Sequence, residues 1–81
     1  MFYVYILYSK FIDNYYVGFT SMSIEERLRR HLCTHKGFTG RAKDWDVVYF
    51  ESYEIKKDAI LREQEIKKWK SKSKLVELIS G

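Results

Sequence analysis

The chain has 81 residues, of which 46% are hydrophobic and 17% aromatic, and its formal net charge is +4. A chain of this length and composition has room for one hydrophobic core, so we expect a single ordered domain over residues 1–81. No apolar run approaches the roughly 20 residues of a membrane-spanning helix, and a single cysteine excludes a disulfide framework.

The N-terminal third predicts a β-hairpin. Met1–Ser9 is apolar and rich in β-branched and aromatic residues, and Tyr15–Phe19 has the same character. The polar stretch Lys10–Asn14 lies between them, and two such runs joined by a short turn are typical of antiparallel strands. Gly18 interrupts the second run, which indicates either a β-bulge or a place where the backbone approaches another group closely.

A helix, a basic loop and a third strand are predicted next. Ser23 and Glu26 have the spacing of a capping box, which predicts a helix over residues 24–34. Residues 36–43 form a basic loop with two glycines. Residues 45–53 predict the third strand, whose apolar centre indicates burial on both faces, as in a central strand.

Two helices complete the predicted fold. Residues 56–70 are strong helix formers, and residues 74–79 supply a last short helix after an interruption at residues 71–73. The order strand-strand-helix-strand-helix-helix predicts an α+β domain. In this domain, helices cover a small three-stranded sheet that is mixed or antiparallel.

One carboxylate falls on the apolar side of the helix over residues 56–70. At about 100° per residue, Glu63 lies inside the stripe that Ala59 and Ile66 define, whereas Glu65 lies at its edge or outside. A carboxylate on the core side must be paired, protonated or bound to a metal. An ion pair, or a side chain that reaches solvent at the rim of the core, is the alternative interpretation.

The helix over residues 24–34 carries a comparable polar pair. His31 falls on its apolar stripe, and Arg27 lies one turn earlier on the same side. A histidine on such a face is commonly a core residue with a satisfied hydrogen bond, and the tyrosines of the hairpin equally fit core and rim packing. These positions alone therefore leave a structural and a functional role open.

The order and spacing of these residues resemble a known family. In chain order, the segments that carry the resemblance are Tyr3-Val4-Tyr5-Ile6-Leu7, Tyr16-Val17-Gly18, Glu26-Arg27-Leu28-Arg29-Arg30-His31, Val47-Val48-Tyr49 and Arg62-Glu63-Gln64-Glu65-Ile66-Lys67-Lys68. Together they cover nearly the whole chain and resemble the GIY-YIG nuclease family. The similarity is in particular to its small stand-alone bacterial members, which resemble the N-terminal nuclease domain of the excision-repair endonuclease excinuclease C.

The resemblance implies roles for five residues. Tyr5 corresponds to the tyrosine that closes the first family motif, and Tyr16 to the tyrosine that opens the second. Arg27 corresponds to the catalytic arginine, and His31 to a histidine common in the active site. Glu63 corresponds to the carboxylate that holds a single divalent metal ion, Mg²⁺ or Mn²⁺.

Two positions qualify this correspondence. Tyr3 stands where the first motif has glycine, a replacement that is frequent in the small branch of the family. The metal-binding acid could instead be Glu65, but the helix positions favour Glu63.

The implied reaction is phosphodiester hydrolysis. A metal ion on Glu63, with waters and a phosphate oxygen as further ligands, would act as a Lewis acid. Arg27 would bind the phosphoryl oxygens through planar charged donors. Tyr5, Tyr16 or His31 would position or deprotonate the attacking water, and the sequence does not distinguish them.

Basic residues predict the contacts with nucleic acid. The candidates are Arg30, Lys36, Arg41 and Lys43, of which the last three belong to the glycine-containing loop. The lysines of residues 67–74 form a second basic feature, for which a solvated helix end is the alternative. Cys33 has no evident base near it in the pattern, and we assign it no catalytic role.

We therefore expect a metal-dependent endonuclease that cuts DNA in repair, or in the processing of branched or damaged DNA, with RNA left open as a substrate. One alternative is a weakly cleaving nucleic-acid-binding module that acts with a partner, and another is an interaction domain whose polar residues pair with each other. The N-terminal apolar run lacks a preceding basic region, so we expect no signal peptide and a cytoplasmic protein, taken as a monomer.

Overall fold

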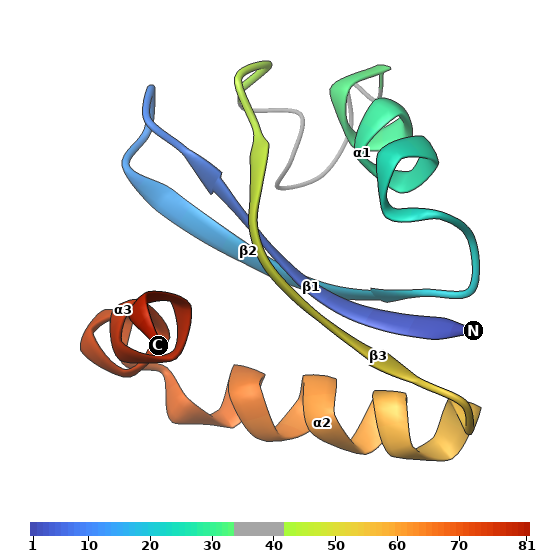
Figure 1. The fold of residues 1–81 in the computed structure, drawn as a ribbon. Coiled ribbons are helices and arrows are strands. Elements are labelled where there is room, and N and C mark those ends of the chain that lie inside the picture. The colour runs from blue at the N-terminus through green and yellow to red at the C-terminus, as the bar shows by residue number, and fades with distance from the viewer. Residues whose placement is uncertain (34–41) are drawn as a thin grey trace.

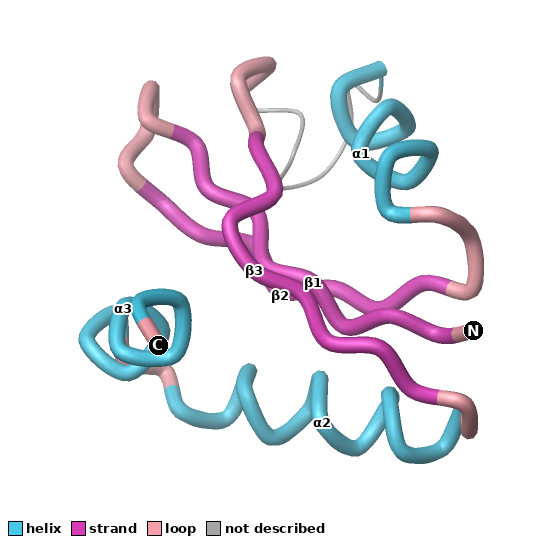
Figure 2. Tube along the Cα trace, viewed as in Figure 1, coloured by secondary structure: helices cyan, strands magenta, loops and turns pink. Residues whose placement is uncertain are grey.

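Three strands and three helices make up the part of the chain that the structure describes. The computed structural model describes residues 1–33 and 42–81, and the side chains of His31 and Cys33 also lie outside the description. The elements are, in order, β1 (Phe2–Ser9), β2 (Asn14–Thr20), α1 (Ile24–Cys33), β3 (Asp46–Tyr53), α2 (Lys56–Trp69) and α3 (Lys72–Ser80). The sheet is antiparallel, with strand order β2-β1-β3. The predicted α+β class is confirmed: α1 covers one face of the sheet, and α2 and α3 cover the other (Figure 1, Figure 2).

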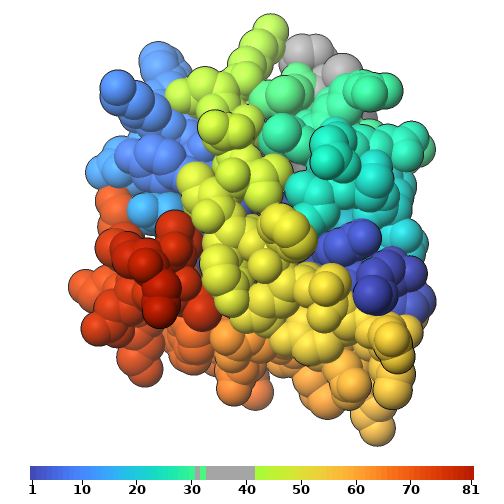
Figure 3. Space-filling model, in the orientation of Figure 1, coloured from blue at the N-terminus to red at the C-terminus, as the bar shows by residue number. Residues whose placement is uncertain are grey.

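The central strand of the sheet is β1, so the prediction of a central position for residues 45–53 is wrong. Val4–Leu7 of β1 are 0–1% exposed, whereas Phe50 of β3 is 56% exposed. Figure 3 shows β3 (yellow) at the surface between α1 and α2, as an edge strand. A register shift in the pairing of β1 with β3 explains why Val47, Val48 and Tyr49 are all apolar although β3 lies at the edge of the sheet. Because of it, Val47 packs on the α1 side of the sheet while both Val48 and Tyr49 pack on the α2 side.

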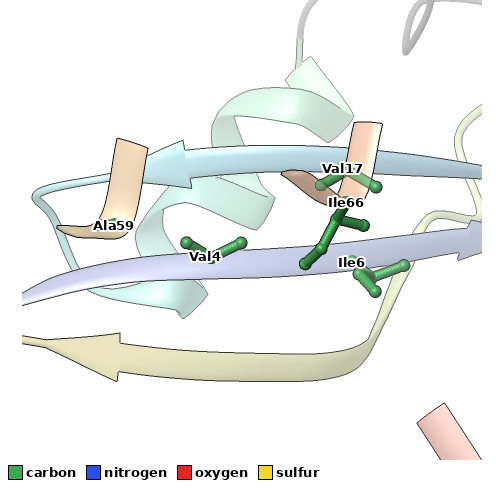
Figure 4. Close-up of a cluster of buried hydrophobic side chains, with 5 residues drawn as sticks. All are labelled: Val4, Ile6, Val17, Ala59 and Ile66. Carbon is green, nitrogen blue, oxygen red and sulfur yellow. The ribbon is translucent and has the colours of Figure 1, made fainter. Parts of the chain in front are cut away.

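The alternating side chains of β1 divide the core into two clusters. The cluster beneath α2 is formed by Val4, Ile6, Val17, Ala59 and Ile66, and Figure 4 shows the Ile66 side chain reaching toward β1 between Val4 and Ile6. The cluster beneath α1 is formed by Tyr5, Leu7, Ala42 and Trp45. Tyr5 therefore lies on the α1 side of the sheet although its chain neighbours pack against α2.

Side-chain caps set the beginnings of two helices. The backbone N–H of Glu26 donates to Ser23 Oγ at 3.2 Å, in agreement with the predicted capping box. The hydroxyl of Ser71 accepts from the backbone N–H of Lys74 at 3.3 Å, so α3 begins at residue 72, two residues earlier than predicted. α2 ends at Trp69, one residue earlier than predicted, and Lys70 follows in a left-handed conformation with φ 47° and ψ 33°.

A partly buried carboxylate joins β3 to α2. Glu51 accepts hydrogen bonds from the hydroxyls of Tyr49 and Tyr53, both at 2.5 Å. It also accepts from Arg62 Nε at 3.0 Å, and Arg62 in turn pairs with the exposed Glu65. Burial by itself raises the pKa of Glu51, but the hydrogen bonds from Arg62 and the two tyrosines outweigh it and hold the pKa below its usual value.

We predict that Glu51→Gln lowers the free energy of unfolding at pH 7 by about 1–2 kcal/mol, because a neutral amide bonds Arg62 less strongly. Since folding lowers the pKa of Glu51, its contribution is complete above the unfolded-state pKa of about 4.3. The contribution is lost as the pH falls through the folded-state pKa. Urea unfolding at a series of pH values between about 7 and 3 measures both effects.

Glu65→Gln is the matched control, because Glu65 bonds the same arginine from a side chain that is 57% exposed. This variant should change the free energy of unfolding by less than about 0.5 kcal/mol at any pH. A difference between wild type and Glu51→Gln that stays constant across the pH series would contradict the prediction.

Candidate active site

Tyr5 of β1 lies directly over Gly18 of β2. The two residues are opposite each other in the antiparallel register, which runs past Gly18 without a shift. A Cβ atom on Gly18 would lie 2.4 Å from Oη and 2.5 Å from Cζ of Tyr5. Gly18 does not have a positive φ, so its backbone conformation does not require a glycine. The strand pairing shows no bulge here either, and the close approach of Tyr5 is therefore the reason for the glycine.

Arg27 of α1 contacts the hydroxyl end of Tyr5. Its Nε donates to Tyr5 Oη at 3.2 Å. Burial raises the pKa of Tyr5, and the hydrogen bond and positive charge of Arg27 offset this only in part, while Tyr16 and Glu63 raise it further. The same hydrogen bond raises the pKa of Arg27. At neutral pH the Tyr5 hydroxyl is therefore protonated and Arg27 is charged.

Tyr16 connects this pair to α2. The ring centroids of Tyr5 and Tyr16 are 6.4 Å apart, with an interplanar angle of 38°. Lys67 Nζ lies 5.9 Å from the centroid of the Tyr16 ring, within cation–π range, and 3.6 Å from the Glu63 carboxylate. An unbroken series of contacts thus runs from Arg27 on α1 through the two tyrosines to α2.

The two candidate acids of α2 have different surroundings. The Glu63 side chain is 19% exposed, and Lys67 is its ion-pair partner among the described residues. The Glu65 side chain is 57% exposed and pairs with Arg62, which also bonds Glu51 of β3. This difference agrees with the positions that helix periodicity predicts, and Glu63 is the acid that lies with the tyrosine–arginine cluster.

The remaining predicted site residues divide into two groups. Arg30 lies on α1 three residues after Arg27, Lys43 precedes β3, and both residues are exposed. Lys36, Arg41 and the His31 side chain lie outside the described residues, so their predicted contacts stay predictions.

Lys67 belongs to this cluster, although the sequence places it only in the basic run of residues 67–74. Its ammonium group contacts both Glu63 and the ring of Tyr16. The available signal was its position four residues after Glu63, since such pairs lie on the same side of a helix.

Two tyrosines and an arginine thus lie together on one face of the three-stranded sheet. The family model of the GIY-YIG catalytic domain matches residues 1–76, and the chain therefore belongs to the GIY-YIG family. Searches of curated proteins and of solved structures gave no significant match. Within the described ranges, no helix has the length and apolar character needed to cross a membrane.

We predict that Gly18→Ala destabilises the fold by about 1–3 kcal/mol, because the added methyl group overlaps the buried ring of Tyr5. Urea unfolding of the variant measures the change. In a Tyr5→Leu background, where the overlapping hydroxyl and ring are absent, the same substitution should cost much less. Equal costs in the two backgrounds would show that the contact with Tyr5 is not what requires the glycine.

Proposed function

We propose that the protein is a divalent-metal-dependent endonuclease that hydrolyses phosphodiester bonds in DNA. The observation that supports this most directly is the cluster of Tyr5, Tyr16, Arg27 and Glu63 in a member of the GIY-YIG catalytic family. The cluster combines a permanent cation, tyrosine hydroxyls and a carboxylate. Phosphodiester hydrolysis needs these kinds of group to stabilise charge, to direct a water and to hold a metal ion.

Arg27 is the group that we propose to stabilise the transition state. The hydrogen bond from its Nε to Tyr5 fixes the plane of the guanidinium. The terminal N–H groups then lie in a defined plane, from which they can form two parallel hydrogen bonds with phosphoryl oxygens. Because the donors are oriented before the reaction, the developing negative charge requires little rearrangement of the protein.

The tyrosines would take different parts in the reaction. Tyr5 is 1% exposed, and burial raises the pKa of its hydroxyl, so Tyr5 would act as a hydrogen-bond donor and not as the general base. Its hydroxyl would also hold Arg27 in place. Tyr16 and His31 are then the candidates to position or deprotonate the attacking water.

The donor set around Glu63 fits a single Mg²⁺ or Mn²⁺ ion. Among the described residues, no group of three or more His, Cys, Asp and Glu side chains could form a metal site on its own. Magnesium usually binds through one or two carboxylates together with waters and substrate phosphates, and the half-buried Glu63 supplies such a carboxylate. An ion held there would act as a Lewis acid on the phosphoryl group.

We extend the proposal to branched or damaged DNA of the kind processed in repair. The net charge of +4 and the exposed Arg30 and Lys43 favour a polyanionic substrate. The test is a cleavage assay with single-stranded, duplex, flapped and branched DNA, each with Mg²⁺ or Mn²⁺. Cleavage that needs the metal ion is the expected result, whereas binding without cleavage of any substrate would favour a binding module.

The first prediction from this proposal concerns the acid. Glu63→Gln should abolish metal-dependent cleavage, because an amide binds a divalent cation far more weakly than a carboxylate, while the urea midpoint and DNA affinity change little. Glu65→Gln removes the same charge two residues away, at an exposed position, and should keep most of the activity. Loss of cleavage in Glu65→Gln with activity retained in Glu63→Gln would move the metal site to Glu65.

The second prediction concerns Arg27. Arg27→Ala should lower the single-turnover cleavage rate by about two or more orders of magnitude, the usual effect of removing one preorganised donor. DNA affinity should fall only slightly, because one side chain contacts one phosphate. Arg27→Lys keeps the charge but loses the planar pair of donors, and should recover only part of the rate. A variant that lost affinity without a change in the saturated rate would assign Arg27 to binding alone.

A further inference from the structure

A groove beside the proposed active site runs along the edge strand β2 toward the junction of α2 and α3. Its volume is about 440 Å³. β2 contributes Tyr15 and Tyr16, α2 contributes Lys67, and the junction contributes Lys70 and Lys72. Tyr16 and Lys67 also belong to the catalytic cluster, so the groove begins where that cluster ends.

The lining of the groove combines cations with an apolar floor. Val17, Ile66 and Leu75 lie among the lining residues, and the three lysines are all exposed. Two of these lysines have acidic neighbours: Lys67 lies 3.6 Å from Glu63, and Lys72 lies 2.9 Å from Asp13. Ion pairs between side chains as exposed as Lys72 and Asp13 contribute little to stability, so Lys72 can bind a phosphate instead.

Lys70 has a backbone conformation that is unfavourable for a lysine. It has φ 47° and ψ 33°, in the left-handed region that a glycine adopts without cost after a helix. The chain therefore accepts backbone strain to keep a charged side chain at this position. Among the described residues, Lys70 has no carboxylate partner to account for it.

We propose that this groove binds a single DNA strand that continues from the phosphate cleaved at the catalytic cluster. Phosphates would contact Lys67, Lys70 and Lys72, while bases would lie on the apolar floor and stack on the ring of Tyr15 or Tyr16. A volume of this size suits a ligand of one or two nucleotides and not a duplex. The proposal rests on the proposed nuclease function, and it specifies a substrate with an unpaired segment next to the cleaved bond.

The test compares two double variants that each remove two positive charges. Lys70→Gly/Lys72→Gln alters the groove, whereas Lys68→Gln/Lys74→Gln alters exposed lysines of the same basic run that do not line it. Affinity for a labelled 20-nucleotide oligothymidylate is measured by fluorescence anisotropy over a range of salt concentrations, with EDTA present to prevent cleavage.

The groove variant should bind the single strand at least fivefold more weakly than wild type. Its plot of log affinity against log salt should be less steep by about 1.4, the value for two lost phosphate contacts on a single strand. The control variant should stay within twofold of wild type, and a duplex of equal length should show a smaller difference between the two variants. Lys70→Gly alone should raise the urea midpoint while it weakens binding, which a merely structural lysine would not do.

Equal losses of affinity for the single strand in the two double variants would overturn the proposal that the groove binds DNA. The proposal would also be overturned if polyglutamate, an acidic polymer without phosphates or bases, displaced the labelled strand as effectively as unlabelled oligothymidylate does. These outcomes do not depend on catalysis: a protein that cuts no substrate but shows the groove-specific loss refutes the nuclease proposal alone. A protein that cuts DNA normally without that loss refutes the groove alone.

Discussion

The contact between Tyr5 and Gly18 is the constraint on which the rest of the candidate site depends. β1 is buried on both faces, so the large ring of a tyrosine in its centre needs space above a neighbouring strand. Gly18 supplies that space, because a residue without a Cβ lets the buried ring lie over the backbone of β2. The hydroxyl is thereby brought within reach of Arg27 on the first turn of α1.

The position of the site at the edge of the sheet follows from the two-layered core. Tyr16 packs with the cluster beneath α1, and its neighbour Val17 packs with the cluster beneath α2. Side chains from helices on opposite faces can meet only where the sheet ends. β2 is an edge strand, so Lys67 of α2 reaches the ring of Tyr16 past its backbone. An arginine from one layer and a carboxylate from the other thus both lie at the candidate site.

The elements were predictable from the sequence because they depend on local patterns, whereas the grouping of Tyr5, Tyr16, Arg27 and Glu63 in one site was predicted from the family resemblance. Hydrophobic period and capping place the helices within one or two residues, and helix periodicity separates Glu63 from Glu65. Strand order was not predictable in this way: an apolar run looks the same in a central strand and in an edge strand with a register shift, as in β3. The left-handed conformation of Lys70 could not be predicted from the sequence either, because a lysine occupies the position where such a conformation usually has a glycine.

The charges on α2 distinguish Glu63, the acid of the proposed metal site, from Glu65. Arg62 is committed to Glu51 of β3 and to Glu65, so this network fixes α2 against the sheet and occupies the outer carboxylate. Glu63 points to the other side of the helix, where its neighbour Lys67 lies at 3.6 Å and also contacts Tyr16. The Lys67 side chain is 50% exposed, and an ion pair with so exposed a partner is weak. A phosphate that attracts Lys67 would therefore leave the Glu63 carboxylate available to a cation, and would couple occupation of the groove to completion of the site.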